Sequence, residues 1–176
     1  GAAQDRRMWL EVVAYDERDN VVFESGRVTD REPVEKPSSD PKYDPQLALF
    51  RDWIYDAEGS PTHDFWEAAP SDAHPAGYEA LTLPFAVDPA IPHWLNARFL
   101  VARYTEVARM TVRFRFRAIG LDVLTDLVGS GDLDPHVIDQ LPTFTMHGAA
   151  VEWRPDEPAL RSLLPDELPC SVEEER

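Results

Sequence analysis

The chain has 176 residues and a mass of 20.0 kDa, and 43% of its residues are hydrophobic. This size and composition are typical of one folded domain whose core needs neither metal nor disulfide bonds. Its 33 acidic residues outnumber 17 basic ones, and the formal charge of −16 argues against nucleic acid or an anionic membrane as a partner and favours a basic protein.

The cysteine content excludes several kinds of site. Cys170 is the single cysteine, so the chain cannot form an internal disulfide or a thiolate zinc site. There is no Cys-x-x-Cys-His motif, so we expect no covalently bound c-type haem. No apolar run reaches the roughly 18 to 20 residues that a bilayer requires, so we expect no transmembrane span and a soluble chain.

The stretch from Met8 to Val28 predicts a β-hairpin. Its first half alternates along the chain and is rich in β-branched and aromatic residues, which suit a pleated sheet. Residues Asp16 to Asn20 then supply a turn, and the extended pattern resumes at Val21 and ends at Ser25-Gly26. Because an isolated hairpin is marginal in water, we expect it to belong to a larger sheet.

The hairpin also resembles part of a known domain. Its segments Trp9-Leu-Glu-Val-Val13 and Val22-Phe-Glu-Ser-Gly26, with a charged turn between them, resemble the non-haem C-terminal β-sandwich domain of bacterial multihaem c-type cytochromes. Similar segments follow in order: Asp56–Gly59 with Thr62–Trp66, Gly77–Glu79 before Leu83-Pro84, and Asn96–Phe99 before Arg103-Tyr104.

This resemblance implies a mainly β fold, an immunoglobulin-like antiparallel β-sandwich. It also implies that a haem-bearing segment lies upstream of Gly1 or on another chain, and that the protein is periplasmic or extracellular. By itself, the cysteine count does not decide the compartment.

The middle of the chain predicts a surface loop and three strands. The proline-rich stretch from Thr29 to Pro45 is typical of a polar surface connection. Alternating or extended patterns predict strands at Gln46–Ala57, Gly77–Val87 and His93–Tyr104.

His63 is the first candidate site residue. It precedes a carboxylate and two aromatic residues, Phe65 and Trp66, and this combination suits an axial haem ligand or a contact with a porphyrin face. The alternative is structural: the aromatic pair fills the edge of the core and His63 hydrogen-bonds the turn. A lone histidine lacks the second ligand that a metal site requires, and His74 is expected to face solvent.

An arginine ladder provides the second candidate site. Residues Met110 to Ile119 alternate strictly, which predicts a strand with one buried apolar face and with Arg113, Arg115 and Arg117 on the other. Guanidinium groups bind carboxylates in pairs, so the ladder suits haem propionates or an acidic partner. The alternative is cross-strand pairing with the chain's own carboxylates, for example on the Trp9–Tyr15 strand.

The last third of the chain predicts two short helices, a strand and a tail. Apolar residues recur at helical spacing after Gly120, with Gly129-Ser-Gly131 as a stop, and Asp134-Pro135 opens a second helix that Pro142 closes. Residues Phe144–Trp153 predict the final strand. We therefore expect a sandwich domain over residues 1–153 with a helical insertion at about 120–142, and an acidic, proline-rich tail over 154–176 with one helical turn at Ala159–Leu164.

No catalytic motif accompanies these elements. The sequence lacks Gly-x-Ser-x-Gly, a phosphate-binding loop and His-Glu-x-x-His, so we expect no enzyme, although a pair of carboxylates with glycosidase-like chemistry stays open. The leading hypothesis is a non-catalytic module of, or partner to, a multihaem c-type cytochrome, which supports extracytoplasmic electron transfer by protein–protein contacts. The alternative is an independent adhesion or ligand-binding sandwich. The first hypothesis predicts an open apolar edge that a partner covers, and the second predicts a self-contained sheet.

Overall fold

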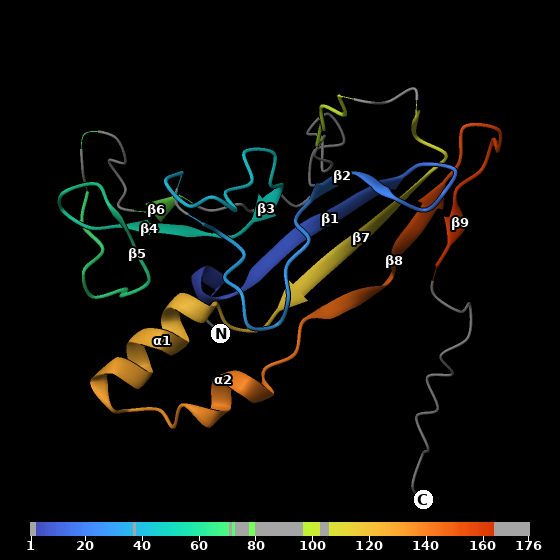
Figure 1. The fold of residues 1–176 in the computed structure, drawn as a ribbon. Helices are drawn as coiled ribbons and strands as arrows, with labels where there is room; N and C mark the ends of the chain where they lie inside the picture. Colours follow the sequence, from blue (N-terminus) through green and yellow to red (C-terminus); the bar gives the residue numbers. More distant parts are fainter. Residues whose placement is uncertain are drawn as a thin grey trace, which may run out of the picture.

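The computed structural model describes residues 3–36, 38–70, 72, 78–79, 97–102 and 106–163. The fold is mainly β, with two antiparallel sheets and two short helices, which confirms the expected class (Figure 1). The larger sheet has the order β2-β1-β7-β8-β9, with β3 also pairing with β1, and the smaller sheet has the order β5-β4-β6. A 3-10 turn, Ala3–Asp5, precedes these elements: β1 Arg7–Tyr15, β2 Val21–Ser25, β3 Leu49–Phe50, β4 Trp53–Tyr55, β5 Pro61–Thr62, β6 Tyr78–Glu79, β7 Arg109–Arg117, α1 Leu121–Ser130, α2 His136–Gln140, β8 Phe144–Trp153 and β9 Arg161–Ser162.

The predicted hairpin is present as β1 and β2. The Asp16 carboxylate accepts hydrogen bonds from the backbone N–H groups of Arg18 and Asn20, and Asp19 takes a positive φ of 62° in the turn. At the far end of β2, Gly26 has a φ of 68°, and its carbonyl accepts a 2.8 Å hydrogen bond from the Trp9 indole N–H. The end of the hairpin is thereby tied to the core.

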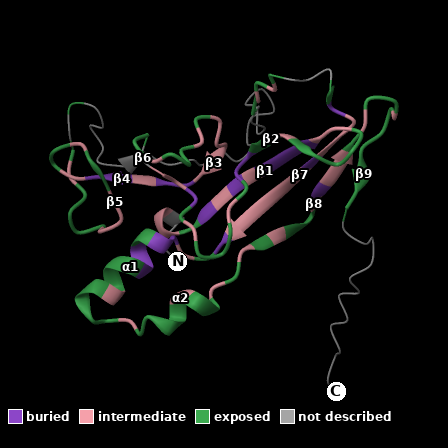
Figure 2. Ribbon diagram, viewed as in Figure 1, coloured by how far each residue is buried: buried purple, intermediate pink, exposed green. Residues whose placement is uncertain are grey.

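The core lies along β1. Trp9 and Ala14 are fully buried, and Val12 and Val13 are nearly so. Figure 2 shows buried residues concentrated along β1 and at the start of α1. The β1 strand runs antiparallel to β7 over its whole length, with Arg7 opposite Arg117 and Tyr15 opposite Arg109. β1 is therefore the strand around which the sheet is built.

The two helices and the final strand also follow the sequence predictions. Helix α1 buries Leu121, Val123 and Leu124, and it ends at Gly131, whose φ of 86° is the left-handed cap that glycine favours. Before α2, the Asp134 carboxylate accepts a hydrogen bond from the His136 backbone N–H. Strand β8 has the predicted bounds.

Three sequence predictions need correction. The strand expected over 46–57 is split between the two sheets, because Arg51 turns inward to a 2.7 Å ion pair with Glu35. Residues 97–102 form no strand, and the amide side chain of Gln46 instead bonds both backbone groups of Leu100. The turn expected at 159–164 is not helical within the described residues, because β9 pairs with β8 there.

Some predicted features lie outside the described residues. Of the strand expected over 77–87, the structure describes only β6. His74, Cys170 and the tail from residue 164 onward are not described.

The close approach at Gly26 gives a stability prediction. A Cβ at this position would lie against the Leu10 carbonyl and the Trp9 ring in a backbone conformation that disfavours L side chains. We expect Gly26→Ala to lower the free energy of unfolding by about 2–4 kcal/mol. Chemical denaturation followed by circular dichroism measures this change.

The matched control is Gly129→Ala in α1, where a Cβ would meet nothing within 4 Å. This substitution should raise the free energy of unfolding by up to about 1 kcal/mol, because alanine is the better helix former. Equal effects of the two substitutions would contradict the close approach at Gly26.

Candidate functional site

One face of the larger sheet is wholly apolar across three strands. Residues opposite one another in antiparallel strands share a face, so the register places Met8, Leu10, Val12 and Ala14 of β1 beside residues of β7 and β8. The β7 and β8 members of this apolar face are Met110, Val112, Phe114, Phe116, Phe144, Val151 and Trp153. At every position that the register assigns on these three strands, this face carries an apolar side chain.

The apolar face is incompletely covered. The expectation that the alternating apolar residues of β7 are buried is wrong: Met110, Val112, Phe114 and Phe116 are all half-buried. On this face Phe144 is 52% exposed and Trp153 is 38% exposed, and Met146, which lies in β8 beside it, is 42% exposed. Figure 2 shows this as a half-buried β7 beside a β8 with an exposed stretch. The half-buried residues of β7 and the exposed residues of β8 leave apolar side chains accessible on this face, so this face is the first candidate functional site.

The opposite face carries the arginine ladder, which is paired internally. Glu11 of β1 is only 7% exposed, and its carboxylate lies 2.7 Å from Arg113 and 3.7 Å from Arg115. Arg115 also donates a 2.7 Å hydrogen bond to the Thr145 hydroxyl. The cross-strand pairing that the sequence offered as an alternative is therefore present.

Arg117, the last residue of the ladder, is completely buried. It donates hydrogen bonds to the backbone carbonyls of Thr29 and Glu32 and to the Thr143 hydroxyl. Burial lowers the pKa of its guanidinium group from the ordinary value. The loop after β2 thus covers this end of the ladder.

A second buried arginine, Arg7, was not singled out by the sequence. It is 1% exposed, and its guanidinium lies 2.8 Å from Glu35 and 2.6 Å from Asp122 at the start of α1. Glu35 also binds Arg51, so one carboxylate joins β1 to the chain segment that enters the smaller sheet. Asp122 is 115 residues from Arg7 in sequence, and no local pattern predicts such a contact.

His63 lies between two carboxylates. Its Nε2 is 2.7 Å from Asp126 of α1 and its Nδ1 is 3.3 Å from Asp64, and the side chain is 20% exposed. Both ring nitrogens are therefore engaged by the protein, and the contact ties the turn after β5 to α1.

The structure does not bring the four predicted site residues together at one site, although Arg113 and Arg115 share Glu11. His63 contacts Asp64 and Asp126, whereas Arg113, Arg115 and Arg117 contact β1, β8 and the loop after β2. In this arrangement each nitrogen of the imidazole faces a carboxylate of the chain, and Arg117 has no exposed surface for a propionate. Haem contact through these residues stays a prediction.

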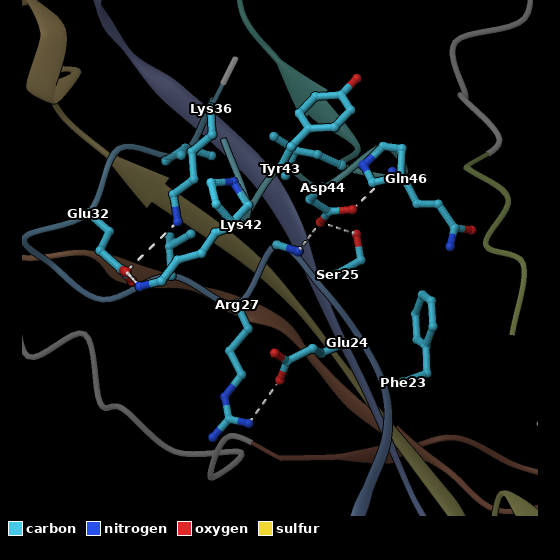
Figure 3. A pocket seen from close by; sticks show the side chains of 16 residues that line it. Phe23, Glu24, Ser25, Arg27, Glu32, Lys36, Lys42, Tyr43, Asp44 and Gln46 are labelled. Atoms are coloured by element: carbon cyan, nitrogen blue, oxygen red, sulfur yellow. Dashed lines mark hydrogen bonds and ion pairs between the residues drawn. The ribbon is translucent and has the colours of Figure 1, made fainter. Parts of the chain in front are cut away.

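A pocket of about 630 Å³ lies between the end of β2 and the segment that leads to β3 (Figure 3). The Asp44 carboxylate accepts 2.8 Å hydrogen bonds from the Ser25 hydroxyl and the Gly26 backbone N–H. Lys42 lies 2.7 Å from Glu32 and Arg27 lies 3.1 Å from Glu24. The labelled lysine, arginine and glutamate side chains in Figure 3 thus pair with one another, and Asp44 fastens the loop to the hairpin.

Neither a membrane-spanning helix nor a metal cluster is present in the part of the chain that the structure describes. No described helix is long and apolar enough to cross a bilayer. The described residues also contain no group of three or more His, Cys, Asp or Glu side chains that could hold a metal ion.

Comparisons with known proteins add one structural similarity. No family model matches the chain, and no curated protein matches it. A solved structure that does match is a penta-haem cytochrome c552 from Thermochromatium tepidum, with a TM-score of 0.46 and 17% sequence identity. The match covers 86% of this chain and 31% of the cytochrome chain, so this chain spans less than a third of its length. At this TM-score and identity, the similarity does not establish a shared function.

The buried carboxylate of the ladder gives a second prediction. Glu11→Gln removes the negative charge between Arg113 and Arg115, so we expect a loss of about 1–3 kcal/mol in the free energy of unfolding. Chemical denaturation measures the loss. Glu24→Gln on β2 is the control: Glu24 is 52% exposed in its ion pair with Arg27, and its loss should cost less than about 0.5 kcal/mol. Equal stability of the two variants would contradict the internal role of Glu11.

The pocket gives a third prediction. The hydrogen bond from Lys42 and, to a smaller extent, the one from the Thr29 backbone N–H lower the pKa of Glu32 to about 2. Because this pKa is depressed in the folded state, the contact stabilises the fold above the ordinary value near 4.5, and the stabilisation is lost as pH falls through about 2. We expect Lys42→Met to move the pKa of Glu32 back toward 4.5 in a carboxyl-carbon NMR titration, with Lys42→Arg as the control that keeps it low. A wild-type midpoint near 4.5 would contradict the contact.

Proposed function

We propose that this chain is a non-catalytic β-sheet module that docks, through the apolar face of its larger sheet, on a haem-bearing segment or subunit of a multihaem c-type cytochrome. The module then serves extracytoplasmic electron transfer by positioning and covering its partner, and it acts in the periplasm or outside the cell. Electron transfer itself belongs to the haem groups of the partner.

The observation that carries this proposal is the open apolar face. A folded monomer gains stability by burying such residues, so aromatic side chains left half-buried across β7 and β8 favour a further covering layer. Each buried aromatic residue removes roughly 150–250 Å² of surface from water, which makes Phe144 and Trp153 strong anchors for a docking contact.

The open surface is a face of the sheet and not an edge. The sequence predicted an uncovered apolar edge. In the larger sheet β1 is paired on both sides, and the described edges are the short strands β2, β3 and β9. The polar face is closed by the ion pair of Glu11 with Arg113 and by the hydrogen bonds of Arg117 to the loop after β2. A partner therefore finds its apolar contact on the side of the sheet opposite the arginines.

The class of partner comes from the hairpin motif at Trp9–Val13 and Val22–Gly26. Its resemblance to the sandwich domain of multihaem cytochromes supports a haem-bearing partner over other classes. A docking role also agrees with the internal pairing of His63 and the arginine ladder, since the module needs no haem ligand of its own.

Co-purification tests this proposal. The tagged chain, expressed in its native host, should carry a Soret absorbance band from a haem-bearing companion. Phe144→Ser and Trp153→Ser should each lower that absorbance about tenfold, because both remove an aromatic anchor from the apolar face.

The matched control is Leu160→Ser, because Leu160 is 60% exposed and lies in the chain segment before β9 and not in the three strands of the apolar face. This variant should keep the wild-type absorbance, and circular dichroism should show all variants folded. Wild-type protein without a Soret band would contradict the proposal and leave an independent adhesion or ligand-binding module. A band that all variants retain equally would place the contact elsewhere.

A further inference from the structure

We infer that a second docking site lies on the turn after β5, where Phe65 and Trp66 form an aromatic knob that binds a basic protein surface. The smaller sheet that carries this turn lies at the other end of the molecule from β8 and β9 (Figure 1). The inference therefore does not rest on the proposed function of the apolar face.

The two aromatic side chains stand unusually far into solvent. Phe65 is 68% exposed and Trp66 is 70% exposed, and their rings form an edge-to-face pair with centroids 5.0 Å apart. The structural role that the sequence offered for this pair, filling the edge of the core, is therefore wrong. Exposure of two adjacent large aromatic residues to water is unfavourable. Their transfer into an apolar pocket of a partner would lower the free energy.

The turn that presents them is held in place by the protein. The Glu67 backbone N–H donates a 2.9 Å hydrogen bond to the Asp64 carbonyl, and the Thr62 hydroxyl lies 3.2 Å from the Glu67 carboxylate. The Ala69 N–H bonds the Tyr55 carbonyl of β4, and His63 is fastened to Asp126 of α1. A fixed turn loses little conformational entropy on binding, so the exposed pair is already arranged for a partner.

The charge around the knob selects the partner. No lysine or arginine occurs in the sequence between Arg51 and Arg98, whereas acidic residues recur throughout that stretch. Asp64 and Glu67 flank the two aromatic residues directly. A surface of this kind repels anionic lipid headgroups and attracts lysine and arginine side chains, which also bind the faces of aromatic rings.

The partner is accordingly a protein surface with lysine or arginine residues around an apolar pocket. Trp66 fits the pocket as the central anchor, since tryptophan is enriched at the energetic centre of interfaces. The flanking carboxylates pair with the basic rim and set orientation and the rate of association.

Selection from a library of short random peptides displayed on phage tests this inference. The wild-type chain is the target, and a double variant, Phe65→Ala with Trp66→Ala, is used for counter-selection. We expect recovered peptides that combine net positive charge with an apolar residue. Their affinity should fall at least about tenfold for Trp66→Ala and should weaken as salt is added.

The control variant is Tyr43→Ala, which removes another exposed aromatic residue, 45% exposed, outside the acidic stretch. It should bind the selected peptides as the wild type does, and thermal unfolding should show that every variant is folded. Peptides that bind the double variant equally, peptides without positive charge, or no recovered peptides would each overturn the inference. Binding to phosphatidylcholine vesicles that the double variant loses would also overturn it, by assigning the knob to a membrane.

Discussion

The pairing of β1 with β7 is the constraint on which the other features depend. These two nine-residue strands run antiparallel in unbroken register, from Arg7 opposite Arg117 to Tyr15 opposite Arg109. That register puts Glu11 beside Arg113 on one face and Leu10 beside Phe114 on the other. A slip of one residue in this register would exchange the two faces and bring charged side chains to the apolar side. The contacts on both faces therefore depend on this pairing.

The two faces differ in whether the chain's own groups pair with or cover their side chains. On the polar face, Glu11, Glu35 and the loop after β2 neutralise or hydrogen-bond the arginines, so the chain closes that side with its own groups. On the apolar face, β7 and β8 keep half-buried aromatic side chains. The chain thus has a large excess of acidic residues, and the arginines of its larger sheet are paired within the chain. Both docking proposals depend on this distribution of charge and on the apolar side chains left accessible.

Local patterns were enough to predict the hairpin, β7, α1 and β8, because each depends on periodicity and on turn residues that are close in sequence. Alternation in β7 also separated arginines from apolar residues correctly. It could not show which face would be covered, since this depends on where the loop at residues 29–35 lies in space. The contacts of Arg7 with Asp122 and of His63 with Asp126 join residues 115 and 63 positions apart, so no sequence spacing reveals them.

The openness of the apolar face can be measured directly through its methionines. The chain has 3 methionines, and Met8 and Met110 lie on this face while Met146 lies in β8 beside it. In a carbon-13 methyl NMR spectrum with a soluble nitroxide, the isolated chain should lose the Met146 signal strongly and the Met110 signal partly, and a bound haem-bearing partner should protect both. The opposite result would be that the nitroxide broadens these methyl signals in the isolated chain no more than those of buried core methyl groups. That result would contradict an open docking face.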